Sequence, residues 1–239
     1  MVTTLALASV AAFSLAFVSA VAGFGGGVLL LPVFTALFGL RVAVPVLTLT
    51  QLTSNAGRVW FNRRELHWPL IGWFSLGAVP TAVIGALVFA AAPLGPLKRL
   101  LGVFLLAVVA WRRLRPQPRR PTDRAFIGVG AASGLGSALL GSVGPLTAPF
   151  FLAHGLFKAA YIGTEAASAV LMHLAKLGGY GAGDLLDLRV FLLGLALVPS
   201  TIVGPWAGKQ ALQRVDETRF VRIVEIGLLV AGTLLIIGV

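Results

Sequence analysis

Long apolar runs separated by short polar breaks organise the chain, and the first run is the longest. No charged residue precedes Arg41, and a helix of about 40 residues would be about 60 Å long, about twice the hydrocarbon thickness of a bilayer. This run is therefore expected to fold back at the glycine cluster 23–27. A cleaved signal peptide over 5–22 is the competing interpretation, which is disfavoured because no basic segment precedes it and a second apolar run follows at once.

The remaining runs predict further membrane segments. They cover 42–62, 68–91, 96–111, 125–141, 145–156, 158–180, 188–206 and 219–238. Two runs, 27–39 and 145–156, are too short to span a bilayer comfortably. They are expected as half-helices of re-entrant hairpins, which lipid tolerates only where irregular backbone is buried or lines a cavity. Pro80 and Pro199 lie inside runs and predict kinks.

The two hydrophobic halves of the chain match each other. At nearly the same offset, Gly27 and Pro32 match Gly144 and Pro149, Gly39-Leu40 matches Gly155-Leu156, 79–85 matches 198–204, and Arg58 falls opposite Lys176. The matches keep one order, which predicts an internal repeat. The expected organisation is a first transmembrane repeat over 1–111, a basic linker over 112–124 and a second repeat over 125–239. The predicted fold is an all-α polytopic membrane protein with two inverted-topology repeats, about eight spanning helices and up to ten segments.

Composition agrees with a bilayer location. Charged residues make up 11% of the 239 residues and hydrophobic ones 58%, whereas a soluble domain has about 25% charged residues. The net charge of +11 is also seen in nucleic-acid-binding proteins. Six of the 19 basic residues, however, lie between Arg112 and Arg124, and most others lie at the ends of apolar runs, as in proteins that follow the positive-inside rule. A nucleic acid is therefore not an expected partner.

The basic residues also predict an orientation. With the linker in the cytoplasm, most cations lie inside, and only Arg41, Lys98, Arg99 and Arg189 lie outside. Both termini are then expected outside. The chain has no Cys, which excludes disulfides, thiolate metal sites and a cysteine nucleophile. Its three His are scattered, so neither a metal nor a cofactor is expected.

The glycine clusters are the first candidate binding elements. They place Gly25, Gly26 and Gly27 in one half and Gly144 in the other. A half-helix that begins near mid-membrane directs free N–H groups and a partial positive charge at an anion. Close helix packing through small residues is the alternative reading.

Two matching polar helix faces are the second candidate. The first carries Thr48, Gln51, Asn55 and Arg58, and the second carries Glu165, Ser168, Met172 and Lys176 with His173 at its edge. Arg58 and Lys176 either flank an anion, bind it in alternate states, or extend to the headgroups. Glu165 either binds a proton or sodium ion or pairs with Lys158. His173 either titrates near neutral pH or makes a helix-helix hydrogen bond.

The segment 22–32, the basic loop 64–68, the basic linker and the second glycine-proline segment resemble the sulfite exporter TauE/SafE family. The resemblance covers nearly the whole chain. It implies a multi-pass transporter of the bacterial inner membrane, built from two related halves, with sulfite or organosulfonates as substrates.

The function expected from the sequence is secondary transport, as an exporter of a small anion, by alternating access. Binding is assigned to the tip glycines with Gln51, Asn55, Arg58, Ser168 and Lys176, and coupling to protons or sodium ions to Glu165 or His173. Besides the anion and the lipid bilayer, a second copy in a homo-oligomer is left open as a partner. A passive anion channel is the alternative, and a membrane-embedded enzyme a more distant one.

Overall fold

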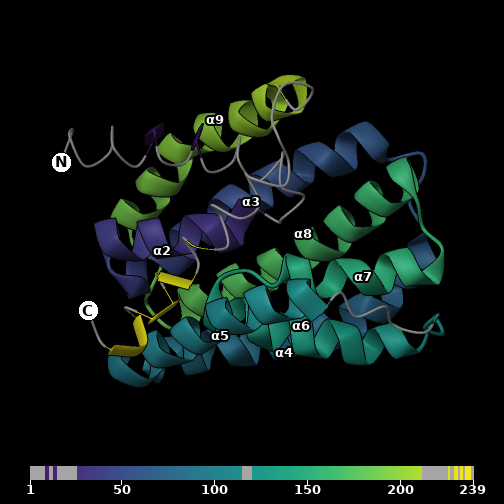
Figure 1. The fold of residues 1–239 in the computed structure, drawn as a ribbon. Coiled ribbons are helices and arrows are strands. Elements are labelled where there is room, and N and C mark those ends of the chain that lie inside the picture. Colours follow the sequence, from purple (N-terminus) through teal and green to yellow (C-terminus); the bar gives the residue numbers. More distant parts are fainter. Residues whose placement is uncertain are drawn as a thin grey trace.

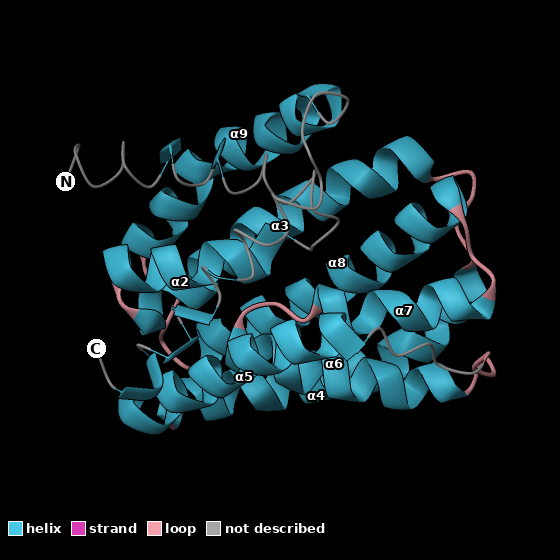
Figure 2. Cartoon of the chain, viewed as in Figure 1, coloured by secondary structure: helices cyan, strands magenta, loops and turns pink. Residues whose placement is uncertain are grey.

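The computed structural model describes residues 9–10, 13–14, 26–114 and 120–211, together with 226, 229–230, 232–233 and 235–237. Every regular element in this part of the chain is a helix (Figure 2). The elements are α2 (Gly26–Phe38), α3 (Leu40–Asn62), α4 (Trp68–Ala91), α5 (Leu94–Leu114), α6 (Ala125–Leu140), α7 (Gly144–His154), α8 (Lys158–Ala182) and α9 (Leu188–Ala211). The all-helical prediction is therefore confirmed.

The helices follow the predicted runs closely. The run 68–91 coincides with α4, whose start is fixed by Pro69 in the first turn and by His67, whose Nδ1 accepts from the Leu70 amide. Such capping satisfies an amide that has no partner within the helix. By length and composition, α4 and 94–111 of α5 are suited to cross a membrane, and α6 and 188–200 are shorter apolar stretches. Most of the predicted run 219–238 lies outside the described residues.

The two predicted half-helices are short helices in the structure. α2 has 13 residues and α7 has 11, so at 1.5 Å per residue each is much shorter than the bilayer core of about 30 Å. Each ends at a glycine with positive φ, Gly39 (φ 77°) or Gly155 (φ 107°), a conformation that glycine adopts without steric cost. A long helix, α3 or α8, follows each turn. The same order of elements thus occurs in both halves.

Helix α4 packs against α6 and α8, and α3 packs against α8 and α9 (Figure 1). If α3 and α4 correspond to α8 and α9, the α3–α9 and α4–α8 contacts are counterparts, as expected for two related halves. The closest packing uses small residues. A β-carbon added at Gly77 or Gly130 would overlap a backbone carbonyl of the facing helix, that of Ile127 or Phe74. Such direct backbone contact is typical of membrane helices.

The bundle has two polar ends. At one end, the α3–α4 loop meets the start of α8 through a hydrogen bond from His67 N to Thr164 Oγ1 (3.0 Å), and the end of α7 meets the 120–124 segment through His154 and Asp123 (2.8 Å). At the other end, Arg41 at the start of α3 donates to the carbonyl of Ala92 after α4 (2.8 Å). The two ends are separated by the apolar helix bodies.

Candidate functional site

The starts of the two short helices meet inside the bundle. Gly27 lies in the first turn of α2, and Ser142 lies two residues before α7 begins at Gly144. A β-carbon added at Gly27 would lie 2.6 Å from Cβ and 2.7 Å from Oγ of Ser142. Two segments from opposite halves, each singled out by its glycines, are thus in direct contact. We call this contact the tip junction.

Helix α3 reaches the tip junction with its polar face. The Cδ atom of Gln51 lies 3.4 Å from the same added β-carbon at Gly27. Gly26 begins α2, whereas Gly25 lies outside the described residues. The side-chain amide of Gln51 is therefore placed beside the start of α2, as its position on the polar face suggested.

The turn before α7 depends on a glycine. Gly141 has φ of +81°, and an added β-carbon would lie 3.0 Å from Leu31 and 3.2 Å from Leu47, so both the backbone and the packing favour glycine here. Helix α7 then begins after Val143, and no side chain caps it. The start of α7 therefore keeps the partial positive charge of an uncapped helix terminus.

Lys176 of α8 lies under this turn and is fully buried. Its Nζ donates to Ser137 Oγ (3.0 Å) and to the carbonyl oxygen of Gly141 (3.1 Å). An ammonium has three N–H donors, and no described residue accepts from the third. Nor does any Asp or Glu of the described residues lie within ion-pair distance of Lys176. The alternative that Lys176 extends to the headgroups is wrong, because its side chain points into the protein.

Arg58 lies in a different environment. Its Nη2 is 3.0 Å from Oε2 of Glu165, and its Nη1 donates to Oδ1 of Asn55 (3.0 Å). The Arg58 side chain is 39% exposed and that of Glu165 13%. Glu165 therefore pairs across the two halves with Arg58, not along its own helix with Lys158.

The two cations occupy different levels of the bundle. Glu165, which marks the level of Arg58, and Lys176 are eleven residues apart on α8, about 16 Å along the helix axis. One small anion cannot touch both in this arrangement. The predicted clamp of one anion by both cations is therefore not formed in this arrangement, and binding in alternate states stays a prediction.

The remaining predicted residues contribute less to the tip junction. Ser168 is buried and its Oγ donates to the carbonyl of Thr164 in its own helix (2.9 Å). His173 is buried next to the level of Lys176, and its Nδ1 has no hydrogen-bond partner among the described residues. The helix-helix hydrogen bond expected for His173 is therefore not seen at this nitrogen.

Two residues at the site were not predicted as ligands, namely Ser137 and Ser142. Ser142 lies inside the glycine cluster of the second half, and the repeat places it opposite Gly25. That correspondence is the signal that would have identified it. Ser137 gave no such signal, because serine is common in helices that pack through small residues.

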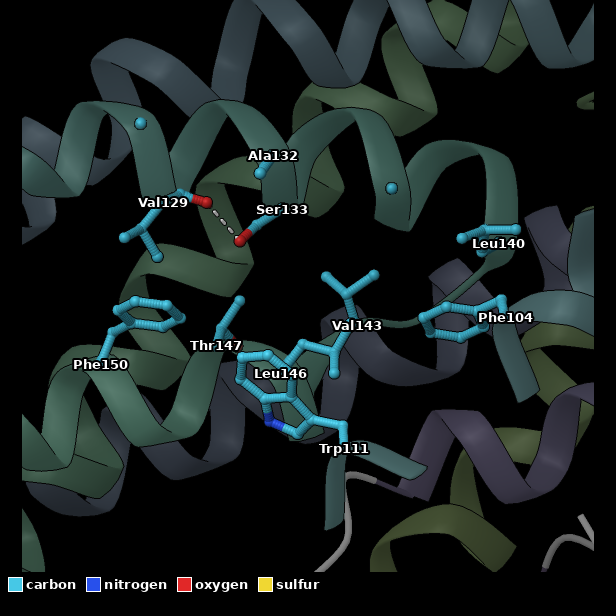
Figure 3. Close-up of a pocket in the computed structure, with 12 residues that line it drawn as sticks. Phe104, Trp111, Val129, Ala132, Ser133, Leu140, Val143, Leu146, Thr147 and Phe150 are labelled. Carbon is cyan, nitrogen blue, oxygen red and sulfur yellow. Dashed lines mark hydrogen bonds between the residues drawn. The ribbon is translucent and has the colours of Figure 1, made fainter. Parts of the chain in front are cut away.

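An apolar cavity lies behind α7, between α5, α6 and α7 (Figure 3). It has a volume of about 420 Å³, and Ser133 and Thr147 are the only side chains of its lining with a hydroxyl. Along α7 it borders Val143, Leu146, Thr147 and Phe150, which point into the cavity from one face of the helix. The Ser133 hydroxyl donates a hydrogen bond to the carbonyl oxygen of Val129 (2.5 Å). This cavity is therefore not a polar ligand site, but it leaves one face of α7 loosely packed.

The tip junction combines features that favour an anion. It has a buried cation with one N–H donor that no described residue accepts, a hydroxyl, a side-chain amide and the start of a short helix that no described side chain caps. No carboxylate of the described residues lies within ion-pair distance of this cation. No group of three His, Asp or Glu suitable for a metal is found among the described residues. The arrangement is suited to binding an anion.

Comparison with known proteins agrees with this geometry. The sequence profile of the family described as sulfite exporter TauE/SafE matches residues 8–235, nearly the whole chain. No curated protein and no solved structure matches the chain. The profile match extends over both short helices, both long polar helices and the segment that joins the halves. The chain therefore belongs to the sulfite exporter TauE/SafE family, a family of polytopic membrane transporters.

Proposed function

We propose that this protein is a secondary transporter that exports a small anion across the bacterial inner membrane by alternating access between its two halves. The observation that carries the proposal is Lys176, a fully buried cation without a carboxylate partner among the described residues. A charge at membrane depth costs about 2.5–3.5 kcal/mol even on the lenient insertion scale. Such a charge is retained where function requires it, and an anion is the partner that compensates it.

The tip junction supplies further contacts to an anion. The starts of α2 and α7 belong to opposite halves and both direct positive helix ends toward the junction. Backbone around Gly25, Gly26, Gly27 and Gly144 binds the anion together with the Lys176 ammonium and the Gln51 amide. This arrangement suits a compact oxyanion with several acceptor oxygens, and sulfite or a small organosulfonate is the substrate class that the family membership supports.

Arg58 is a second binding position for the anion. Asn55 and Ser168 lie on the polar helix faces between the levels of Arg58 and Lys176. The levels of Arg58 and Lys176 are about 16 Å apart along the helix axis. This separation supports an anion that binds the two side chains in succession over one that contacts both at once. Glu165 and His173 are the candidate groups for coupling to protons or sodium ions. Glu165 is the stronger one, since its charge is tied directly to Arg58 (3.0 Å).

The topology is part of the proposal. The end of the bundle with the α3–α4 loop, the 120–124 segment and the start of α8 carries Arg63, Arg64, Arg124 and Lys158. The positive-inside rule places this end in the cytoplasm. The linker is then cytoplasmic and both termini are outside. The division into repeats 1–111 and 125–239 gives each half one short hairpin helix.

Sulfite flux in proteoliposomes tests the proposal. Wild-type protein is expected to accumulate sulfite against its gradient, whereas a passive channel only equilibrates it. Lys176→Met keeps the volume and removes the charge, and loss of a charged hydrogen bond of about 1.5–3 kcal/mol predicts a loss of sulfite affinity of about 10- to 100-fold. Lys98→Met, at the start of α5, is the matched control. Normal sulfite flux in Lys176→Met would contradict the proposal.

A further inference from the structure

The tip junction is closed by two small residues. Gly27 has no side chain, and its α-carbon packs directly on the side chain of Ser142. Ser142 is 8% exposed, and its Oγ lies 2.7 Å from a β-carbon added at Gly27. This hydroxyl lies where the two halves of the chain touch.

Ser142 is linked to the buried cation through the backbone of the preceding residue. Lys176 Nζ donates to the carbonyl of Gly141, the residue directly before Ser142. Gln51 approaches Gly27 from the other side, with Cδ at 3.4 Å from the added β-carbon. A cation, a hydroxyl and an amide from three different helices or turns therefore surround one point of contact.

The two sides of the junction differ in their packing. On the α2 side, Val28 and Leu31 are fully buried in the larger hydrophobic core. On the α7 side, Val143 and Leu146 border the cavity of about 420 Å³ between α5, α6 and α7 (Figure 3). Helix α7 therefore borders free space on this face. This space would allow the α7 tip to move if the junction opened.

We propose that Ser142 is a substrate-contacting residue and that its contact with Gly27 sets the largest anion that the protein transports. This inference rests on the proposed function and deepens it, since it assigns size selection to one pair of residues. The hydroxyl donates to an oxygen of the bound anion, beside the Lys176 ammonium. The combined size of the side chains at 27 and 142 limits how far the opened junction admits an organic substituent.

A substitution series separates size from hydrogen bonding. Gly27→Ala adds a methyl group that collides with Ser142, and flux of sulfite is expected to fall at least tenfold. Gly27→Ala combined with Ser142→Gly removes the collision and is expected to restore sulfite flux to within about threefold of Ser142→Gly alone. Ser142→Ala keeps the size and removes the donor, so sulfite flux falls while the size limit stays.

The probes are sulfite, methanesulfonate, ethanesulfonate and benzenesulfonate, measured as initial flux in proteoliposomes. Ser142→Gly is expected to raise the flux ratio of ethanesulfonate to methanesulfonate severalfold. An unchanged ratio, or a folded double variant as inactive as Gly27→Ala, would overturn the assignment to Ser142 while sulfite transport stands. Wild-type vesicles that transport none of the four anions would overturn both this inference and the proposed function.

Discussion

Arg58 of α3 and Glu165 of α8 form an ion pair across the two halves of the chain, with 3.0 Å between Nη2 and Oε2. Oε2 of Glu165 is buried and accepts no well-aligned hydrogen bond from the described residues. The interaction of this oxygen with Arg58 is therefore mainly electrostatic. In the proposed cycle, an anion that reaches Arg58 would compete with this carboxylate.

Neutralising Glu165 is expected to uncouple transport from the pH gradient. If Glu165 is the coupling group, loss of its negative charge would release Arg58 for the anion. Glu165→Gln mimics the protonated state at every pH. The measurement is methanesulfonate flux with and without an imposed pH gradient, because this anion keeps its charge over the range used, unlike sulfite.

Glu65→Gln in the exposed α3–α4 loop is the control and is expected to keep wild-type coupling. A Glu165→Gln protein that still responds to the pH gradient like the wild type would exclude Glu165 as the coupling group and leave His173 as the remaining candidate.

Breaking the same ion pair from the other side is expected to cost stability. Arg58→Gln leaves the mostly buried Glu165 without its cation, and truncation of one partner of a buried pair destabilises by up to about 3–5 kcal/mol. Since Arg58 is partly exposed, the expected loss is smaller, about 1–2 kcal/mol. The double variant Arg58→Gln/Glu165→Gln recovers most of it.

Thermal unfolding in detergent measures this double-mutant cycle. Anion flux should stay low in both Arg58 variants, because stability is recovered without the cation. If the two substitutions lower the unfolding temperature additively, the residues are not coupled and the ion pair does not stabilise the fold.

Two glycines on α6 test the packing against α4. A β-carbon at Gly130 would overlap the carbonyl of Phe74, whereas one at Gly128 would meet nothing within 4 Å. Gly130→Ala is therefore expected to destabilise by about 1–3 kcal/mol or more through overpacking. Gly128→Ala is expected to be neutral or stabilising, since alanine favours a helix by about 1 kcal/mol over glycine. Equal unfolding temperatures for the two variants would contradict the close α4–α6 contact.

Filling the cavity behind α7 is expected to slow transport. Ala132 on α6 lines this space, and Ala132→Phe would occupy much of it without removing a polar contact. If α7 moves into the cavity during each cycle, sulfite flux falls at least fivefold while sulfite binding to the resting protein is kept. Both are measured on the same preparation, flux in proteoliposomes and binding by calorimetry in detergent.

Ile84→Phe, at a strongly exposed position of α4, is the control and should transport like the wild type. Unchanged flux in a folded Ala132→Phe protein would show that the cycle does not use this space.

The order of apolar runs was enough to predict the helices. Segment 68–91 coincides with α4, and the short runs 27–39 and 145–156 correspond to α2 and α7. Length limits, glycine turns and the repeat are local properties of the chain, so they can be recognised without tertiary contacts. The family resemblance agreed with the profile match over residues 8–235.

The partners of the polar residues could not be predicted in the same way. Glu165 was expected to pair with Lys158 or to bind an ion, and it pairs with Arg58 from the other half. Lys176 was expected near an anion or the headgroups, and it donates to Ser137 and Gly141, up to 39 residues away in sequence. Which residue faces which depends on the rotation and depth of each helix in the bundle.

The sequence by itself determined that this is a multi-helix membrane protein with two short helices that begin at glycine clusters, because hydrophobicity, charge and backbone freedom act locally. The division into two similar halves stays a prediction from the internal matches. Only the tertiary structure decided that the two clusters meet at Gly27 and Ser142, and that a cation without a carboxylate partner among the described residues lies beneath them. Small residues permit a close approach of two helices at many positions along the chain. The packing of the whole helices decides which of these close contacts forms.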